Sequence, residues 1–348
     1  MERSSVRSEF AASSRKNGGG DAKSKRANNI IVAVSALVVI VCLGILGVDL
    51  YHTYEAKKNH ENIKNMYSTA QRTVIEPVQA DTPADAPAGT AAPQGGADTG
   101  NEVVYTPREI LPAAQELLAI NPDTVGFVSI PDCVYEPVVK GTDNDYYLTH
   151  NFYGAQRSCG TCFADYRNIV GDRERSDNII LYAHNQKDGT MFGNLDYYRW
   201  DPAYWLKNPF IYFNTNYSED AYVIISSFVV NSLPESDNGN LFDYNNYINF
   251  AADEGSKYSF AVFAKEITER SHIITGVPFD ESDEYITLST CSTEWDDSRH
   301  VIVARKLREG ETTDNFDTTN FAKNPDPKWP AIYYKYHGGS WGGDQSAG

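Results

Sequence analysis

The chain has 348 residues, a formal net charge of −17 at pH 7 and a pI of about 4.8. This length suffices for one large or two small domains with extensions. The acidic balance argues against a nucleic-acid partner, which needs a basic face. Five cysteines are too few for a disulfide scaffold.

The N-terminal part of the chain predicts a membrane anchor. Residues 1–28 are polar and lack apolar periodicity, which predicts a disordered tail. Residues 30–48 form an uncharged apolar run that, at about 1.5 Å per residue, can cross a bilayer core of about 30 Å. A cleaved signal peptide, the alternative, usually starts near residue 1 and ends at a small-residue cleavage site. Because this run starts late and Asp49 follows it, we predict a retained anchor.

Basic residues are concentrated before this apolar run. Lys57 and Lys58 follow it closely, whereas seven basic residues precede it: Arg3, Arg7, Arg15, Lys16, Lys23, Lys25 and Arg26. The positive-inside rule therefore predicts a single-pass protein with a cytoplasmic N-terminus and with everything after Val48 outside the cell.

Composition divides the chain into five segments. After a tail over 1–28 and a transmembrane anchor over 29–49, residues 50–102 are expected to form a stalk and a flexible Ala/Pro/Gly-rich linker. A folded domain is predicted over 103–310, and an extension with aromatic residues and glycine over 311–348. The linker would hold the folded domain away from the membrane.

Short strands dominate the predicted folded domain. Strands are expected over residues 125–130, 135–139, 161–164, 178–183, 210–213, 221–230, 285–290 and 299–305. Helices are expected over residues 112–121, 191–198 and 244–270, with a turn or short helix over 144–148. Thr106 and Glu109 form a capping-box pattern, but Pro112 favours a helix that starts at the proline. Many short strands with few helices predict a mixed, mainly β fold, either a barrel or a sandwich with helices at its ends.

A cysteine ends one of the predicted strands and an arginine opens the next. Residues 285–290 alternate in period two, which puts Cys291 on the polar side of its strand. If the two strands pair, Arg299 returns close to Cys291, because paired Cβ atoms lie roughly 5 Å apart. A neighbouring cation favours the thiolate, which is the nucleophile. Taken alone, such a cysteine is more often a small core residue.

A cysteine nucleophile needs a partner that moves protons, normally histidine. Among the histidines of the folded domain, His184 stands out, because the apolar run 179–183 delivers it to the end of a buried strand. A structural hydrogen-bonding role is the alternative for a single such histidine. No metal site is expected, because Cys159 and Cys162 are the one compact pair and no histidine lies near them in sequence.

Four motifs then support a family resemblance. Residues 287–291 with the following Arg299 resemble the signature of the sortases, the cysteine transpeptidases of Gram-positive cell surfaces. Three further stretches resemble class B sortases in particular: 137–148, 163–168, and 182–185 with 191–195. The resemblance covers roughly residues 104–308, and it implies a β-barrel of about eight strands with flanking helices.

The resemblance implies a role for each candidate residue. Cys291 would be the nucleophile, His184 the general acid/base, and Arg299 the group that stabilises substrate and oxyanion. The substrate would be a surface protein with a C-terminal sorting signal of the Pro-x-Thr type, and the acceptor an amine of a cell-wall precursor or a pilin lysine. The family does not generally need a cofactor. The substrate groove is expected to be lined by Ser289, Thr290, Asn144, Tyr147 and Leu148.

Several alternatives stay open at the level of sequence. A cysteine endopeptidase that resolves the acyl-enzyme with water would share the acylation chemistry, and an inactive surface-binding module would not need the intact set of candidate residues. The spacing of Cys159 and Cys162 matches redox pairs, although two free thiols are the plainer interpretation. The extension over 311–348 either is loosely ordered or packs over the barrel.

Overall fold

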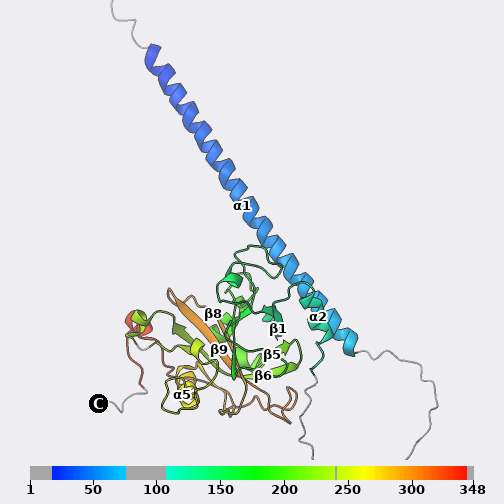
Figure 1. Cartoon of the computed structure of the whole chain (residues 1–348). Coiled ribbons are helices and arrows are strands. Elements are labelled where there is room, and N and C mark those ends of the chain that lie inside the picture. Colours follow the sequence, from blue (N-terminus) through cyan, green and yellow to red (C-terminus); the bar gives the residue numbers. More distant parts are fainter. Residues whose placement is uncertain (1–17, 76–106, 240, 343–348) are drawn as a thin grey trace, which may run out of the picture. The chain divides into compact units, whose positions relative to one another are not determined.

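The computed structural model describes residues 18–75, 107–239 and 241–342 (Figure 1). The chain divides into two compact units, with the boundary between Asn59 and His60. The predicted linker up to residue 102 and the first residues of the predicted tail lie outside the described residues.

Helix α1 (Gly18–Ile75) contains the predicted anchor and runs into the second unit. Its segment Asn28–Thr69 has a mean hydropathy of 3.0 over its most apolar window, which meets the length and composition of a membrane span. The helix begins at Gly18, inside the segment predicted as a disordered tail, and continues through the predicted stalk without a break. A signal sequence near an N-terminus can satisfy the same criteria of length and composition.

Eight strands of the second unit form a closed barrel (Figure 1). They are β1 (Thr124–Ile130), β2 (Val134–Val139), β3 (Phe163–Ala164), β4 (Asn178–Tyr182), β5 (Phe210–Thr215), β6 (Glu219–Asn231), β8 (Tyr285–Cys291) and β9 (Ser298–Lys306). Around the barrel the order is β1-β2-β3-β4-β8-β9-β6-β5, and β5 pairs with β1 to close it. The β2–β3 and β4–β8 pairs are parallel and the others antiparallel. The two-residue strand β3 completes the ring between β2 and β4, and the predicted barrel of about eight strands is confirmed.

The alternation of β8 does not separate a buried face from an open one. Thr287 and Ser289, expected on an open polar side, are each at most 2% exposed. The Thr287 hydroxyl donates to Asn178 Oδ1 at 2.9 Å, so its burial leaves no unpaired group. The strand is covered on both faces of the barrel wall, and Cys291 becomes exposed because it lies at the strand end.

Short helices and turns surround the barrel. They are α2 (Pro112–Leu118), η1 (Tyr146–Leu148), η2 (Gly193–Leu195), α3 (Asp196–Trp200), α4 (Tyr204–Lys207), η3 (Pro234–Asp237), η4 (Tyr244–Asn246), α5 (Phe260–Arg270) and α6 (Ala331–His337). Helix α2 starts at Pro112 as predicted, and residues 107–111 are not helical, so the capping-box pattern does not start a helix. The turn expected over 144–148 is present as η1. The helix expected over 191–198 is instead the short pair η2 and α3.

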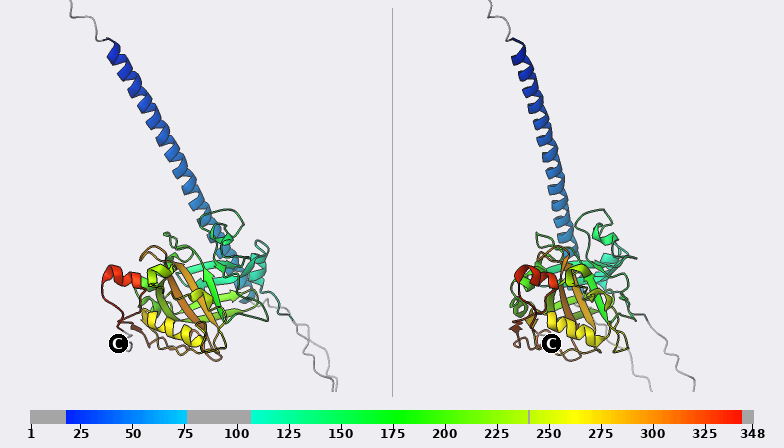
Figure 2. Two further views of the ribbon diagram at one scale, coloured as in Figure 1. Left: turned by 60° about the vertical axis from the view of Figure 1, so that its left-hand side comes forward. Right: turned by 90° about the vertical axis from the view of Figure 1, so that its left-hand side faces the viewer.

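Within the long helix predicted over 244–270, the structure has the short 3₁₀ turn η4 and helix α5, which lies beside β6 of the barrel (Figure 2). Ser259 caps its start, with its hydroxyl accepting from the backbone of Val262 at 3.5 Å. Residues 244–259 are mostly turns because their backbone bonds to distant groups. Asn178 Nδ2, for example, donates to the carbonyl of Tyr247 at 3.0 Å. Asparagine, aspartate and glycine, which are frequent in this stretch, favour such turns over helix.

The described part of the C-terminal extension packs on the barrel unit. Phe316 contacts Phe210 with ring centroids 5.8 Å apart, and Phe321 stacks on Trp205 at 5.7 Å. Strand β10 (Ala322–Lys323) pairs with β7 (Ile273–Ile274). Of the two sequence alternatives, the packed extension is the one found over residues 311–342.

Aromatic rings of the extension also reach the loop between β8 and β9, residues 292–297. Trp329 stacks on Tyr333 of α6 with ring centroids 4.1 Å apart. Both rings meet Trp295 of this loop edge-on at 6.4 Å. Trp295 is 9% exposed, so the extension helps to bury the centre of the loop.

Candidate active site

Three neighbouring strand ends bring the candidate catalytic residues together. In the antiparallel β8–β9 pair, Cys291 lies directly opposite Arg299. In the parallel β4–β8 pair, Tyr182 lies opposite Ser289, so the same register continued by two residues sets His184 beside Cys291. Neighbouring strands are about 4.8 Å apart. The sheet therefore lines up the imidazole, the thiol and the guanidinium in adjacent positions.

All three residues line one cavity of about 380 Å³. Its wall also contains four of the five predicted groove residues: Asn144, Leu148, Ser289 and Thr290. Cys291 is exposed at this cavity, whereas His184 and Arg299 are half-buried. The accessible thiol therefore lies on a concave surface.

Tyr147, the fifth predicted groove residue, does not line the cavity. Its side chain is 3% exposed, and its hydroxyl donates to Asp123 Oδ2 at 2.6 Å. In the 3₁₀ turn η1, successive side chains point about a third of a turn apart, so Tyr147 and Leu148 face different surroundings. Tyr147 therefore packs beneath the turn that carries Leu148.

The hydroxyls of Ser289 and Thr290 hold the walls of the cavity together. The Ser289 and Tyr244 hydroxyls are 2.6 Å apart, which ties β8 to the segment after β6. The Thr290 hydroxyl donates to the carbonyl of Ala183 at 2.8 Å, which ties β8 to the residue before His184. Both side chains are buried, so they shape the cavity floor.

The His184 ring is fixed by the turn that carries Leu148. Its Nε2 lies 2.8 Å from the Leu148 carbonyl oxygen. A carbonyl only accepts hydrogen bonds, so Nε2 carries a proton in this arrangement. The backbone is held as well, because the carbonyl of His184 accepts from Phe192 N at 3.0 Å. The Nε2–H donor and the orientation of the imidazole are thus set before substrate arrives.

Asp165 organises the cavity wall from behind. Its fully buried carboxylate accepts from Arg167 Nε at 2.8 Å, and from Asn144 Nδ2 and the Tyr182 hydroxyl at 3.0 Å. Burial alone would raise the pKa of Asp165, but the hydrogen bonds from Arg167 and Asn144 hold that pKa below its usual value. The motif over residues 163–168 therefore orients two side chains of the cavity.

Several cavity residues were missed by sequence reasoning. Tyr182 directly precedes Ala183 and His184 in one of the quoted motifs, so proximity to the motif could have identified it. The end of β6 and the segment after it carried no signal in the sequence, and only Tyr244 and Asn245 fall within the helix expected over 244–270. These parts of the chain supply Asn231, Ser232, Leu241, Phe242, Asp243, Tyr244 and Asn245.

The described cysteines are all free thiols, Cys159 and Cys162 included. Cys162 is fully buried, and burial raises the pKa of its thiol well above the ordinary value. Burial also raises the pKa of Cys159. Both thiols are thereby kept protonated and poorly nucleophilic.

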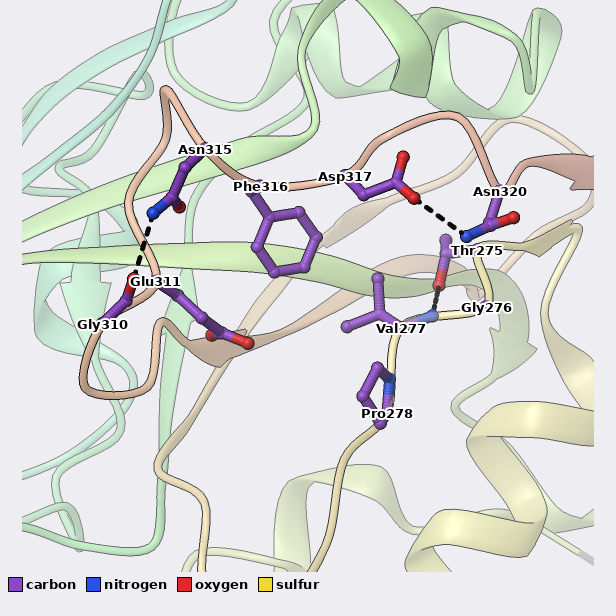
Figure 3. A pocket seen from close by; sticks show the side chains of 10 residues that line it. All are labelled: Thr275, Gly276, Val277, Pro278, Gly310, Glu311, Asn315, Phe316, Asp317 and Asn320. Atoms are coloured by element: carbon purple, nitrogen blue, oxygen red, sulfur yellow. Dashed lines mark hydrogen bonds between the residues drawn. The ribbon is translucent and has the colours of Figure 1, made fainter.

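A second cavity of about 390 Å³ lies between residues 275–278 and the start of the extension (Figure 3). Its polar side chains already have partners within the protein. Asp317 accepts from Asn320 Nδ2 at 3.3 Å, and Glu311 accepts from Arg305 Nη2 at 2.9 Å. We therefore interpret this cavity as part of the packing interface between the extension and the barrel. Among the described residues, no group of three or more His, Cys, Asp or Glu side chains could hold a metal ion.

Residues 128–307, more than half of the chain, match the family model of the sortase domain. The chain is similar to the sortase B of Listeria monocytogenes, with 28% identity over 209 residues, which is 57% of this chain and 75% of that protein.

Two solved structures are similar in fold. The Staphylococcus aureus sortase B–substrate complex gives a TM-score of 0.54 at 22% identity, and the alignment covers 73% of this chain and 97% of that one. A sortase B complexed with triglycine gives a TM-score of 0.55 at 22% identity, covering 73% of this chain and 98% of that one.

Proposed function

The chain belongs to the sortase family, in class B, and is a cysteine transpeptidase; we propose that it joins surface proteins to a cell-surface amine. In this proposal it cleaves a C-terminal sorting signal of the Pro-x-Thr type. The acceptor is an amine of a cell-wall precursor or a pilin lysine. The observation that carries the proposal is the shared cavity at which Cys291, His184 and Arg299 meet.

Acylation begins with attack by the Cys291 thiolate on the backbone carbonyl after the signal threonine. The C–S bond forms and a tetrahedral oxyanion develops, which the Arg299 guanidinium stabilises from the paired strand. The C–N bond then breaks, and the protonated imidazole of His184 gives a proton to the leaving amine, which leaves the imidazole neutral. The products are a thioacyl-enzyme and the released C-terminal peptide.

Transfer reverses these roles with a new amine. The acceptor nitrogen attacks the thioester carbonyl and gives up a proton to His184, and the C–S bond breaks to regenerate the thiolate of Cys291. If water attacks instead, the same intermediate is hydrolysed, which is the endopeptidase alternative. The exposure of Cys291 gives both nucleophiles access, so product analysis must separate them.

Recognition of the sorting signal is assigned to the cavity wall. Asn144 and Leu148 line one part of it, and Ser289 and Thr290 line its floor. The S. aureus sortase B solved with a substrate and the sortase B solved with triglycine support a peptide signal and an amine acceptor as the two ligands. Residues 29–49 would hold the chain in the membrane, with the catalytic domain over 103–310 outside the cell. The apolar part of α1 supports the membrane span, and the basic residues that precede it in the sequence support the orientation.

The test is intact-mass spectrometry of the full-length chain in detergent with a panel of Pro-x-Thr peptides, with and without triglycine. We expect an acyl adduct that is absent in Cys291→Ala, accumulates poorly in His184→Ala, and converts to a glycine-extended product with triglycine. Cleavage that triglycine leaves unchanged would favour the hydrolase. An adduct that persists in Cys291→Ala would contradict the assigned nucleophile.

A further inference from the structure

The β8–β9 loop joins the proposed nucleophile to the proposed oxyanion stabiliser, so its conformation determines how the two groups face each other. The loop is closed at its base, where Ser292 N donates to the Ser298 carbonyl at 2.9 Å. The Ser298 hydroxyl bonds to the Trp295 carbonyl at 2.7 Å. These contacts are internal to the loop and do not fix it relative to His184.

Arg199 of α3 connects the β8–β9 loop to helix α3. Its side chain is 4% exposed, and its guanidinium binds two residues of the loop. One nitrogen donates to the Thr293 hydroxyl at 3.1 Å, and another pairs with the Glu294 carboxylate. The same guanidinium pairs with Asp196 Oδ1 at 3.2 Å. A planar guanidinium can hold several acceptors in fixed directions, which a lysine cannot do.

Asp196 links Arg199 to the segment that carries His184. Its second oxygen accepts from Asn185 Nδ2 at 3.0 Å, and the same amide nitrogen donates to the Cys291 carbonyl at 2.9 Å. A carboxylate and a carbonyl both accept, so the orientation of the Asn185 amide follows from its partners. Asn185 directly follows His184 in the chain. One side chain therefore connects the histidine segment to the backbone of the cysteine.

We propose that Arg199, Asp196 and Asn185 are positioning residues that hold the β8–β9 loop and the His184 segment in one arrangement for catalysis. None of the three lines the cavity, so they act through Cys291, His184 and Arg299 and not on the substrate directly. This proposal rests on the proposed function of those residues. It assigns to α3 a part in the reaction that does not depend on contact with the sorting signal.

The chain offers a matched control near the starts of β4 and β8, whereas His184 and Cys291 lie at the other ends of these two strands. Arg175, just before β4, is also largely buried and pairs with two carboxylates, Asp220 at 2.9 Å and Glu284 at 2.8 Å. Glu284 directly precedes β8. Arg175→Ala therefore removes a comparable buried ion pair far along the strands from the cavity.

The experiment measures kcat and KM for a sorting peptide with triglycine, and the melting temperature, on the full-length chain in detergent. In Arg199→Ala we expect kcat to fall about ten-fold or more with KM within about two-fold, because small misplacements of reacting groups cost rate. Arg199→Lys is expected to recover part of that loss. Arg175→Ala is expected to lower the melting temperature but to keep kcat within about two-fold of the unsubstituted chain.

Two outcomes would overturn the proposal. One is a kcat for Arg199→Ala that matches that of Arg175→Ala at temperatures where both are folded. The other applies if Arg199→Ala does not fold: Glu294→Gln and Asn185→Ala then test the same network, and unchanged kcat in both would refute it. Cys291→Ala distinguishes a failure of the proposed function from a failure of the positioning role. If it stays active, the proposed function fails, whereas its inactivity beside a normal Arg199→Ala removes the positioning role alone.

Discussion

Cys291 and Arg299 face each other as paired residues of β8 and β9, at the end of the barrel where the β8–β9 loop begins and ends. The pairing is a backbone property, so it does not depend on the rotamer of either side chain. A substitution of the Arg299 side chain can therefore change its chemistry while the strand pair remains intact.

Arg299→Lys keeps the positive charge but removes the planar fork of the guanidinium. We expect kcat/KM to fall about 100-fold, as for loss of an oxyanion donor, with the melting temperature within about 1 °C. Steady-state kinetics and thermal unfolding check this. The side chain has one described internal bond, to the Ser298 carbonyl, so a large loss of stability would contradict the assigned role.

Asp165→Asn tests the carboxylate behind the cavity wall. Removing its charge weakens its hydrogen bonds from Arg167, a side chain that is 35% exposed, which should cost about 2 kcal/mol, or roughly 4 °C in melting temperature. We also expect a higher KM, because Asn144 and Tyr182 lose their common acceptor. Asp145→Asn removes an exposed carboxyl of the neighbouring turn and is the control. Equal effects of the two substitutions would count against the role of Asp165.

The same carboxyl predicts a pH dependence of stability. The pKa of Asp165 in the folded protein is lowered, so its contribution is fully present above the unfolded value of about 3.9. That contribution is lost as the pH falls through the folded pKa. Thermal unfolding between pH 6 and pH 3 should therefore show a smaller decrease for Asp165→Asn than for the unsubstituted chain. Parallel curves would mean that Asp165 is not the group responsible.

Truncation after Thr312 tests the packed extension while it keeps Glu311, the partner of Arg305. It removes the Phe316 and Phe321 contacts, and we expect a loss of about 3 kcal/mol, or roughly 6 °C in melting temperature. Tyr336→Ala, at a side chain that is 66% exposed, should leave the melting temperature within about 1 °C. An unchanged melting temperature in the truncated chain would mean that the extension does not pack in solution.

Gly193 lies where the chain passes close to the segment after His184. A Cβ at this position would sit 2.1 Å from the Gln186 carbonyl oxygen, so Gly193→Ala must displace backbone. We expect a loss of about 1–3 kcal/mol together with a lower kcat. Gly255→Ala meets a flexible Asp253 side chain at 3.3 Å and should have little effect. If both alanines are tolerated equally, the close approach is not maintained.

Thiol titration of the denatured full-length chain without reductant distinguishes free cysteines from a Cys159–Cys162 disulfide. Five reactive thiols are expected, because each cysteine is free. Three would indicate that the pair is oxidised. In the native protein at pH 8, we expect Cys291 to react much faster than the fully buried Cys162.

Local sequence patterns predicted the strand ends that carry the site. They did not predict segments whose structure depends on contacts with residues far away in the sequence. The apolar run before His184 and the β8–β9 hairpin are encoded in neighbouring residues, so both could be anticipated. The turns after residue 244 are held by Asp177 and Asn178, which lie far away in sequence. A helical interpretation of that segment could not take those bonds into account.

The orientation of individual side chains was the other limit. Tyr147 and Leu148 are neighbours in one motif. Because successive side chains of a 3₁₀ turn point about a third of a turn apart, Tyr147 faces the interior and Leu148 lines the cavity. The Arg199 network was equally hidden, because its members come from three segments that only the folded barrel brings together.

In the sequence, Trp295 lies midway between Cys291 and Arg299. The rings that cover it are Tyr333, in the last described helix α6, and Trp329, just before that helix. A chain synthesised from its N-terminus can close the barrel before these rings have emerged, because domains begin to fold as they emerge. The loop therefore acquires its complete packing only after the C-terminal residues have been made. Any product of early termination would carry the full set of proposed catalytic residues on an incompletely supported loop.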